Sequence, residues 1–252
     1  MQIVSLFRYP VKGLSPQALS SVSLEKGKTV PFDRAYAIEN GPARFDPEEP
    51  RYLPKMNFLM LMRNERLAAL KTEFDEDSQT LTVFRDGKQV ARGQLTTKLG
   101  RQMLEQFFAG YMKKEELKGP PRIVSSPGHS FSDVSEKCLH FVNLASVREV
   151  ERTVGVPLDP VRFRANVFFD GADPWEEKRW LGQVLKIGTA ELKVFKETVR
   201  CDATNVNPAT AQRDTTIPGT LQRTYGNACV GIYAKVIADG EIRPGDEITL
   251  RS

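Results

Sequence analysis

Residues 198–210 read Thr-Val-Arg-Cys-Asp-Ala-Thr-Asn-Val-Asn-Pro-Ala-Thr, and they place a cysteine where an apolar strand gives way to a polar turn. This cysteine, Cys201, directly follows Arg200. A neighbouring cation favours the thiolate form of a cysteine, which is both a nucleophile and a metal ligand. A half-buried structural cysteine fits the same residues equally well, so this stretch alone leaves both interpretations open.

Two segments near the start of the chain each hold one cation in a constrained position. Residues 9–16, Tyr-Pro-Val-Lys-Gly-Leu-Ser-Pro, bracket Lys12 with proline and glycine. Residues 33–36, Asp-Arg-Ala-Tyr, place Arg34 at the mouth of a strand. A solvated turn lysine and a surface ion pair are the alternatives to a ligand-binding role.

A third polar segment, residues 161–166, reads Val-Arg-Phe-Arg-Ala-Asn. Strand alternation would put Arg162, Arg164 and Asn166 on one face. Neighbouring cations repel each other unless an anion or carboxylates compensate them, so the segment predicts an anionic ligand.

Composition limits the class of protein. The chain has 252 residues and a net charge of +4, with no basic run, which does not indicate a nucleic-acid binder. No stretch approaches the roughly 20 apolar residues of a membrane span. Residues 1–8 read as a strand and not as a signal peptide, so we expect a cytoplasmic protein.

The cysteines and histidines do not form a recognisable metal pattern. Cys138, Cys201 and Cys229 are widely spaced, and no Cys-x-x-Cys pair exists. The only histidines, His129 and His140, show no ligand spacing. We expect Cys229, within an apolar strand, to be a buried structural thiol.

Hydrophobic periodicity predicts a β-rich chain with a few helices. We expect a hairpin around the Asp-Gly turn at 86–87, a core-facing helix over 96–117, and a helix over 144–154 that begins after Asn143. The apolar face of the 96–117 helix would include Leu99, Met103, Phe107 and Met112, with Leu104, Phe108 and Tyr111. Further expected elements are strands at 2–8, 22–24, 35–38, 58–62, 138–142, 166–170, 184–187, 191–196, 230–237 and 247–250, and a short helix at 173–181.

Taken in order, these segments resemble the MOSC family, named for the C-terminal domain of molybdenum cofactor sulfurase. Residues 9–12 and 33–36 look like the N-terminal β-barrel domain that precedes it, and 163–166 look like its Phe-Arg-Pro-Asn element, with Ala165 in place of proline. Residues 200–210 resemble the family's Arg-Cys-x-x-Thr-x-Val-Asp-Pro-x-Thr stretch. Residues 226–234 and 242–246 resemble its closing strands.

The resemblance implies a mixed α/β, β-rich fold. An N-terminal β-barrel-like domain over residues 1–120 would pack on a MOSC β-barrel over residues 121–252, with a few flanking helices.

The family also implies a molybdenum cofactor, which is a pterin dithiolene with a terminal phosphate and an oxo-molybdenum centre. Cys201 matches the protein ligand of the metal in members that reduce N-hydroxylated compounds. Asp202, where an aliphatic residue is expected, would relay protons near the metal or point away. The matching cofactor-binding residues are Lys12, Arg34, Ser132, Asp133, Ser135, Arg164, Asn166, Thr198, Arg200, Thr204 and Asn205.

By this resemblance the chain is a molybdenum-dependent oxidoreductase that reduces amidoximes, hydroxylamines or N-hydroxylated bases. The chain carries no ferredoxin domain, so a separate ferredoxin-, flavin- or cytochrome-type protein would supply electrons. The alternative is a sulfur carrier, in which Cys201 takes sulfur from a pyridoxal-phosphate cysteine desulfurase. A β-rich binding protein without activity is a third possibility.

Overall fold

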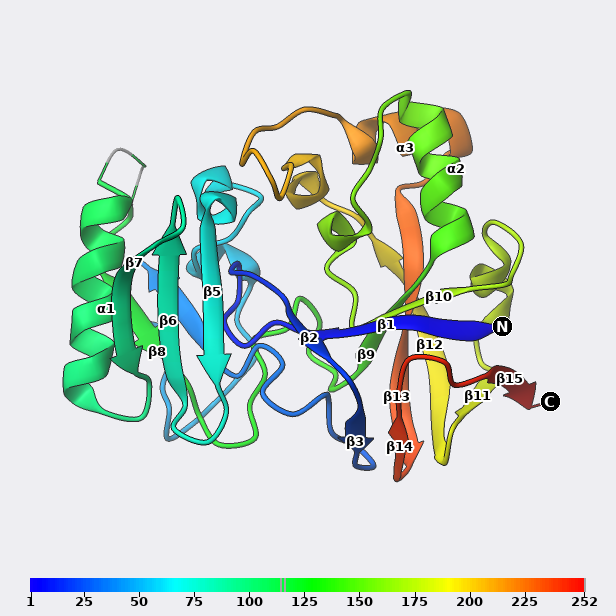
Figure 1. The fold of residues 1–252 in the computed structure, drawn as a ribbon, viewed down its shortest axis with the longest axis horizontal. Helices are drawn as coiled ribbons and strands as arrows, with labels where there is room; N and C mark the ends of the chain where they lie inside the picture. Colours follow the sequence, from blue (N-terminus) through cyan, green and yellow to red (C-terminus); the bar gives the residue numbers. More distant parts are fainter. Residues whose placement is uncertain (114, 116, 252) are drawn as a thin grey trace.

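A computed structural model describes residues 1–113, 115 and 117–251 (Figure 1). Its largest element is an eight-stranded sheet in the order β15-β11-β12-β13-β9-β10-β1-β2, antiparallel except for the β9–β10 pair. The strands are β1 (Gln2–Arg8), β2 (Gln17–Leu19), β9 (Leu139–Asn143), β10 (Val167–Asp170), β11 (Val184–Ile187), β12 (Ala190–Val199), β13 (Cys229–Ala238) and β15 (Ile248–Arg251). The expected β-rich mixed fold is therefore confirmed.

The two central parallel strands have apolar side chains on both faces because both faces are covered. Phe141 and Phe169 are fully buried on one face in the core inside the curved sheet. Val142 and Phe168 face the other way and pack beneath two helices, α2 (Leu144–Val154) and α3 (Ile217–Tyr225). Figure 1 shows these helices together above the sheet.

Strands from the first half of the sequence pair with strands from the second half. β1 pairs with β10 of the second half, and Phe7 N donates to Asn166 O over 2.8 Å. β3 (Val22–Leu24) likewise pairs with β14 (Gly240–Ile242). The expected boundary between residues 120 and 121 stays a prediction, but strands on both of its sides share one sheet.

A smaller lobe lies beside this sheet (Figure 1). It contains β5 (Leu70–Asp75), β6 (Thr80–Arg85) and β7 (Lys88–Gln94), the pair β4 (Ala37–Asn40) and β8 (Pro121–Val124), and the helix α1 (Lys98–Tyr111). The predicted hairpin is confirmed, since Asp86 and Gly87 both have positive φ and join β6 to β7.

Helix α2 also begins and ends as the sequence predicts. The Asn143 side chain accepts a hydrogen bond from Ala145 N over 3.0 Å, and Gly155 ends the helix in the left-handed conformation. No helix among the residues described is long and apolar enough to cross a membrane.

Three local expectations were wrong. Residues 58–62 are not a strand, because the Asn64 side chain accepts from Met60 N and turns the chain between two 3-10 helices, η1 (Lys55–Asn57) and η2 (Glu65–Ala69). Residues 161–166 do not alternate, because Asp159 caps Val161 N and starts a 3-10 helix, η3 (Pro160–Phe163). Helix α1 buries Leu104 and Phe108, and Met112 just after it is buried, as expected, but Leu99 and Met103 are largely exposed and do not belong to the core-facing side.

The contact between α1 and β7 gives a stability prediction. A Cβ at Gly100 would lie 2.2 Å from Gln94 O and 2.5 Å from Gln94 N, whereas a Cβ at Gly110 of the same helix would meet nothing within 4 Å. We expect Gly100→Ala to lower the free energy of unfolding by roughly 3 kcal/mol. Gly110→Ala should leave it unchanged or raise it by up to about 1 kcal/mol. Urea titrations followed by circular dichroism measure both, and equal effects would contradict the tight packing.

Candidate functional site

A cleft of about 240 Å³ lies between the small lobe and the large sheet. The predicted site residues that line it come from five segments that are far apart in the sequence. Nine of the predicted site residues line it: Lys12, Arg34, Ser132, Asp133, Arg164, Asn166, Thr198, Arg200 and Cys201. These residues therefore form one site, although their roles in binding a cofactor stay predictions.

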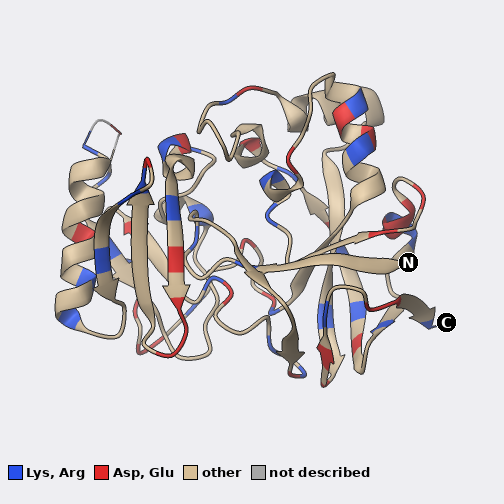
Figure 2. Ribbon diagram, in the orientation of Figure 1, with Lys and Arg blue, Asp and Glu red and all other residues tan. Residues whose placement is uncertain are grey.

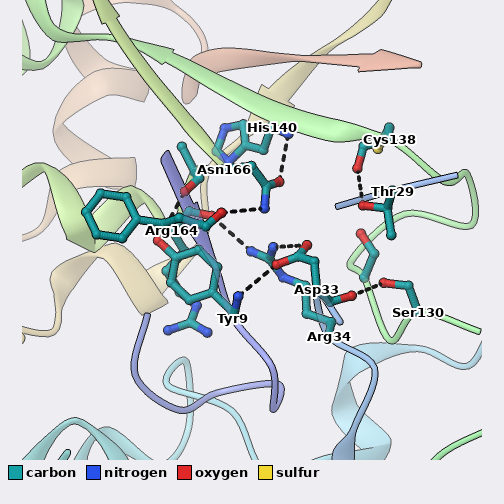
Figure 3. Close-up of polar contacts among 12 residues, drawn as sticks. Tyr9, Thr29, Asp33, Arg34, Ser130, Cys138, His140, Arg164 and Asn166 are labelled. Atoms are coloured by element: carbon teal, nitrogen blue, oxygen red, sulfur yellow. Dashed lines mark hydrogen bonds and ion pairs between the residues drawn. The ribbon is translucent and has the colours of Figure 1, made fainter. Parts of the chain in front are cut away.

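A buried tyrosine supports two of the arginines. The guanidinium carbons of Arg34 and Arg164 lie 4.5 and 4.2 Å from the centre of the Tyr9 ring. Arg34 Nη2 donates to Arg164 O over 2.9 Å, and Asp33 accepts from Tyr9 N over 2.8 Å and pairs with Arg34 (Figure 3). Burial raises the pKa of Tyr9 to about 12, so this residue stays neutral between the two cations.

Four buried donors on residues that line the cleft have no hydrogen-bond partner among the described residues: Arg162 Nε, Arg164 Nη2, Arg200 Nε and the Thr198 hydroxyl. Both Arg164 and Arg200 are anchored through other nitrogens. Arg164 Nη1 donates to Leu14 O over 2.8 Å, and Arg200 Nη2 donates to Phe163 O over 2.7 Å. Buried polar groups are nearly always paired in native proteins. The cleft therefore has the donors for a ligand that is rich in acceptor oxygens.

Burial also penalises the charge on these groups. It lowers the pKa of Arg164 to about 10 and lowers the pKa of Arg200 and of Lys12. A bound anion would offset this cost, because it would supply the missing negative charge at the same place.

A chain of ion pairs forms the opposite wall. Lys12 Nζ donates to Phe131 O over 2.8 Å and pairs with Asp133, whose other oxygen lies 4.0 Å from Lys55 Nζ. Burial alone would raise the pKa of Asp133, but Lys12 and Lys55 hold it well below its ordinary range. Burial alone would lower the pKa of Lys55, but Asp133 and the nearby Cys201 raise it.

The positive charge of the protein is concentrated in the cleft. Seven Lys and Arg but only three Asp and Glu line it. The whole chain has 36 Lys and Arg and 32 Asp and Glu, so the rest of the chain is balanced. Figure 2 shows both signs interspersed along the ribbon of both lobes.

Cys201 lies half-buried where β12 passes into the 3-10 helix η5 (Asp202–Asn205). Its carbonyl accepts from Thr204 N over 3.0 Å and from the Thr204 hydroxyl over 2.9 Å. These bonds fix the backbone, while the thiol faces the cleft. Cys201 belongs to no group of three or more His, Cys, Asp and Glu that could hold a metal within the described part of the chain.

Four predicted site residues do not line the cleft. Thr204 holds the Cys201 turn, and Asn205 accepts from Ile217 N over 2.8 Å and so begins α3. Asp202 accepts from the Asn205 amide over 3.2 Å, which directs it away from the cleft. Ser135 bonds to Glu136 over 3.0 Å. Thr204 and Asn205 therefore support the site from outside it, whereas Asp202 and Ser135 are exposed.

Cys138 also lines the cleft, whereas Cys229 does not. Cys138 is buried, and burial raises its pKa to about 12. Cys229 is half-buried and not buried as expected, and burial together with Glu197 raises its pKa. Neither combines the exposure and the cationic neighbours of Cys201.

The sequence reasoning missed Lys55, His140 and Tyr233, which also line the cleft. His140 Nε2 lies 3.3 Å from Arg200 Nη1, and Tyr233 is the cross-strand partner of His140. Tyr233 occupies an alternating position of a predicted strand, which is a weak signal. Nothing in the sequence around Lys55 marks it as a site residue.

Comparison with known proteins agrees with this arrangement. Residues 1–118 match the MOSC N-terminal beta barrel domain, and residues 126–249 match the MOSC domain. The chain belongs to the MOSC family, as the resemblance of its motifs predicted.

The matched relatives differ in length and are distant. A molybdenum cofactor sulfurase of Drosophila willistoni is 33% identical over 120 residues, which span 46% of this chain and 15% of that protein. The YuaD protein of Bacillus subtilis has a TM-score of 0.47 and 14% identity, covering 100% of this chain and 95% of that one. YiiM of Geobacillus stearothermophilus has a TM-score of 0.36 and 22% identity, covering 45% and 54%.

Two buried threonines distinguish ligand binding from structural support. The hydroxyl of Thr198 is unpaired, and that of Thr204 is bonded. In ligand-free protein, Thr198→Val should leave the free energy of unfolding unchanged or raise it by up to about 1 kcal/mol, whereas Thr204→Val should lower it by about 1 kcal/mol. Chemical denaturation measures both. Equal losses would mean that Thr198 is structural.

His140 makes stability depend on pH. Burial, then Arg200 and Arg34, hold its pKa well below the ordinary value of 6.5, so the folded protein keeps it neutral. The unfolded chain binds a proton near that value, so stability is lost as the pH falls below it. The slope contributed by one proton is at most about 1.4 kcal/mol per pH unit.

We expect His140→Gln to remove most of one proton's slope between about pH 6.5 and 5, measured by denaturation at each pH. His129→Gln is the control. Its pKa is also lowered by burial and Lys137, but His129 is only partly buried and should contribute less. An unchanged slope in His140→Gln would contradict a neutral His140.

Proposed function

We propose that this chain binds a molybdenum cofactor in the cleft and uses it to reduce N-hydroxylated compounds with electrons from a separate protein. The observation that supports it most is the set of unpaired buried donors on Arg164, Arg200 and Thr198, which converge on the same cleft as an accessible cysteine. Such donors suit a ligand with a phosphate and a pterin.

The residues of the cleft fit this cofactor in charge and in donor chemistry. Lys12, Arg34 and Arg164 would hold the phosphate, because their positive charges are buried and fixed by hydrogen bonds. Thr198 and Arg200 would donate to acceptor atoms of the pterin through atoms that are now unpaired.

Cys201 would supply the protein ligand of the metal. A soft thiolate suits molybdenum better than a carboxylate does. Since the described residues contain no group of three or more potential metal ligands, the dithiolene of the cofactor would provide other ligands. When bound, the cofactor supplies two-electron redox chemistry at an N–O bond.

Lys55 is the group of the chain placed to assist at this position. Reduction of an N-hydroxyl group to an N–H consumes two electrons and two protons and releases water. Its raised pKa keeps Lys55 Nζ protonated beside Cys201, so it can hold a substrate oxygen through a charged hydrogen bond. Asp133 keeps this side chain on the cleft wall.

Sulfur transfer is a second candidate, favoured by the match to a protein named molybdenum cofactor sulfurase. In that function Cys201 would carry sulfur as a persulfide, which it would take from a cysteine desulfurase and pass on. The same half-exposed thiol serves this role, because attack on a sulfur donor requires an accessible thiol.

Replacement of Cys201 tests the first proposal. We expect Cys201→Ala and Cys201→Ser to lower amidoxime reduction by cofactor-loaded protein, driven by a chemical reductant, by roughly 100-fold or more. Cys229→Ser, at the other half-buried thiol, is the matched control and should keep its activity. Metal analysis of each variant reports cofactor loading separately.

Three outcomes separate the candidates. Retained molybdenum and full activity in Cys201→Ala would refute the ligand assignment. Loaded wild-type protein that cannot reduce an amidoxime would refute the reductase. Mass spectrometry showing one added sulfur on Cys201 after incubation with a desulfurase and cysteine, in protein without molybdenum, would favour the sulfur carrier.

A further inference from the structure

A second cavity, of about 690 Å³, lies behind one wall of the cleft. The wall is the segment 31–36. Arg34 lines the cleft, Phe32 and Tyr36 line the second cavity, and Asp33 borders both. In Figure 3, Asp33 is tied to Tyr9 and Arg34 on one side, and its carbonyl accepts from Ser130 on the other. We name this space the Arg101 cavity.

The walls of the Arg101 cavity combine apolar surface with positive charge. Phe32 and Tyr36 provide aromatic surface and are held by Phe74, whose ring centre lies 5.4 and 6.2 Å from theirs. The other apolar residues that line the cavity are Val30, Pro31, Ala35, Pro47 and Pro127. A volume of this size is within the usual range for a small-molecule site.

The charged groups of the cavity leave an excess of positive charge. Lys28, Arg101 and Lys137 line it, and Asp33 is its one carboxylate among the described residues. Asp33 is already engaged by Tyr9 N and Arg34, and Lys28 pairs with Glu25. Arg101 and Lys137 therefore lack a carboxylate partner within the part of the chain that the structure describes.

Arg101 is held in place in a way that suits anion recognition. Its Nε donates to Leu95 O and its Nη2 donates to Ser125 Oγ, the latter over 3.0 Å. A guanidinium has five N–H donors, so three of them stay available to a ligand. A fixed planar guanidinium matches the two oxygens of a carboxylate.

We propose that the Arg101 cavity binds a small aromatic carboxylate, with its carboxylate on Arg101 and Lys137 and its ring against Phe32 and Tyr36. The site is separate from the cofactor cleft and does not depend on molybdenum. It shares one wall with the cleft, so an occupant would contact the same short segment that carries Arg34.

Titration of the full-length protein with 2-naphthoate tests the charge requirement. We expect saturable one-to-one binding by calorimetry, and at least about tenfold weaker binding of the neutral 2-naphthylmethanol. Absence of naphthoate binding, or equal affinity for the two probes, would overturn the proposal.

Variants locate the site. Arg101→Gln should weaken naphthoate binding about tenfold or more, and Lys137→Gln about two- to fivefold. Lys88→Gln, at the tip of the β6–β7 hairpin, makes the same charge change elsewhere, and Lys55→Gln makes it in the cleft. Both controls should keep wild-type affinity.

Arg101 also holds Leu95 and Ser125, so Arg101→Gln could unfold the lobe. Lys137 is exposed, and its variant keeps the test valid in that event. If Lys137→Gln and a folded Arg101→Gln both keep wild-type affinity for naphthoate, the site is refuted. A loss of naphthoate binding in Lys55→Gln would refute it as well. Amide chemical-shift changes at Phe32 and Tyr36 are expected on binding.

Discussion

The pairing of β1 with β10 is the constraint on which the site depends. This pairing joins residues about 160 positions apart and carries the chain from Arg8 directly into Tyr9 and Lys12. Asn166 fixes the junction twice, since its carbonyl accepts from Phe7 N and its side chain accepts from His140 N. Tyr9 thus reaches Arg164, and Lys12 reaches Asp133. Without this register, the cations would lie on separate surfaces, where water would solvate them and no common ligand would be needed.

The free-energy cost of burying those cations indicates which kind of ligand the site would bind. Arg164 and Arg200 each donate to a protein carbonyl and each keep one buried nitrogen without a protein acceptor. A protein that needed these residues only for stability would gain by pairing or replacing them. The unpaired buried donors therefore support a ligand-binding role for the cleft as much as the cysteine does. The protein contributes orientation and charge, and the redox chemistry would come from the bound group.

Sequence alone predicted those parts of the fold that local rules govern. The Asp86-Gly87 hairpin and the Asn143 cap were predicted because turn and cap chemistry require particular residues there. Residues 58–62 and 161–166 were misread because single side chains, Asn64 and Asp159, impose turns that hydrophobic periodicity does not reveal. The family motif located the cleft but did not separate residues that face it from residues such as Thr204 and Asn205 that shape the turn. Lys55 was missed because only tertiary structure brings it beside Cys201.

The large sequence separation between β1 and its partner β10 has a consequence for folding during synthesis. On the ribosome, β1 emerges first but must wait until β10 has been synthesised before it finds its partner. Until then an apolar strand with unpaired backbone groups is open to association with other chains. The same delay applies to the cleft, since it contains both Lys12 and Cys201 and is complete only after both have been synthesised. Any ligand of the cleft must therefore be inserted after the chain has folded.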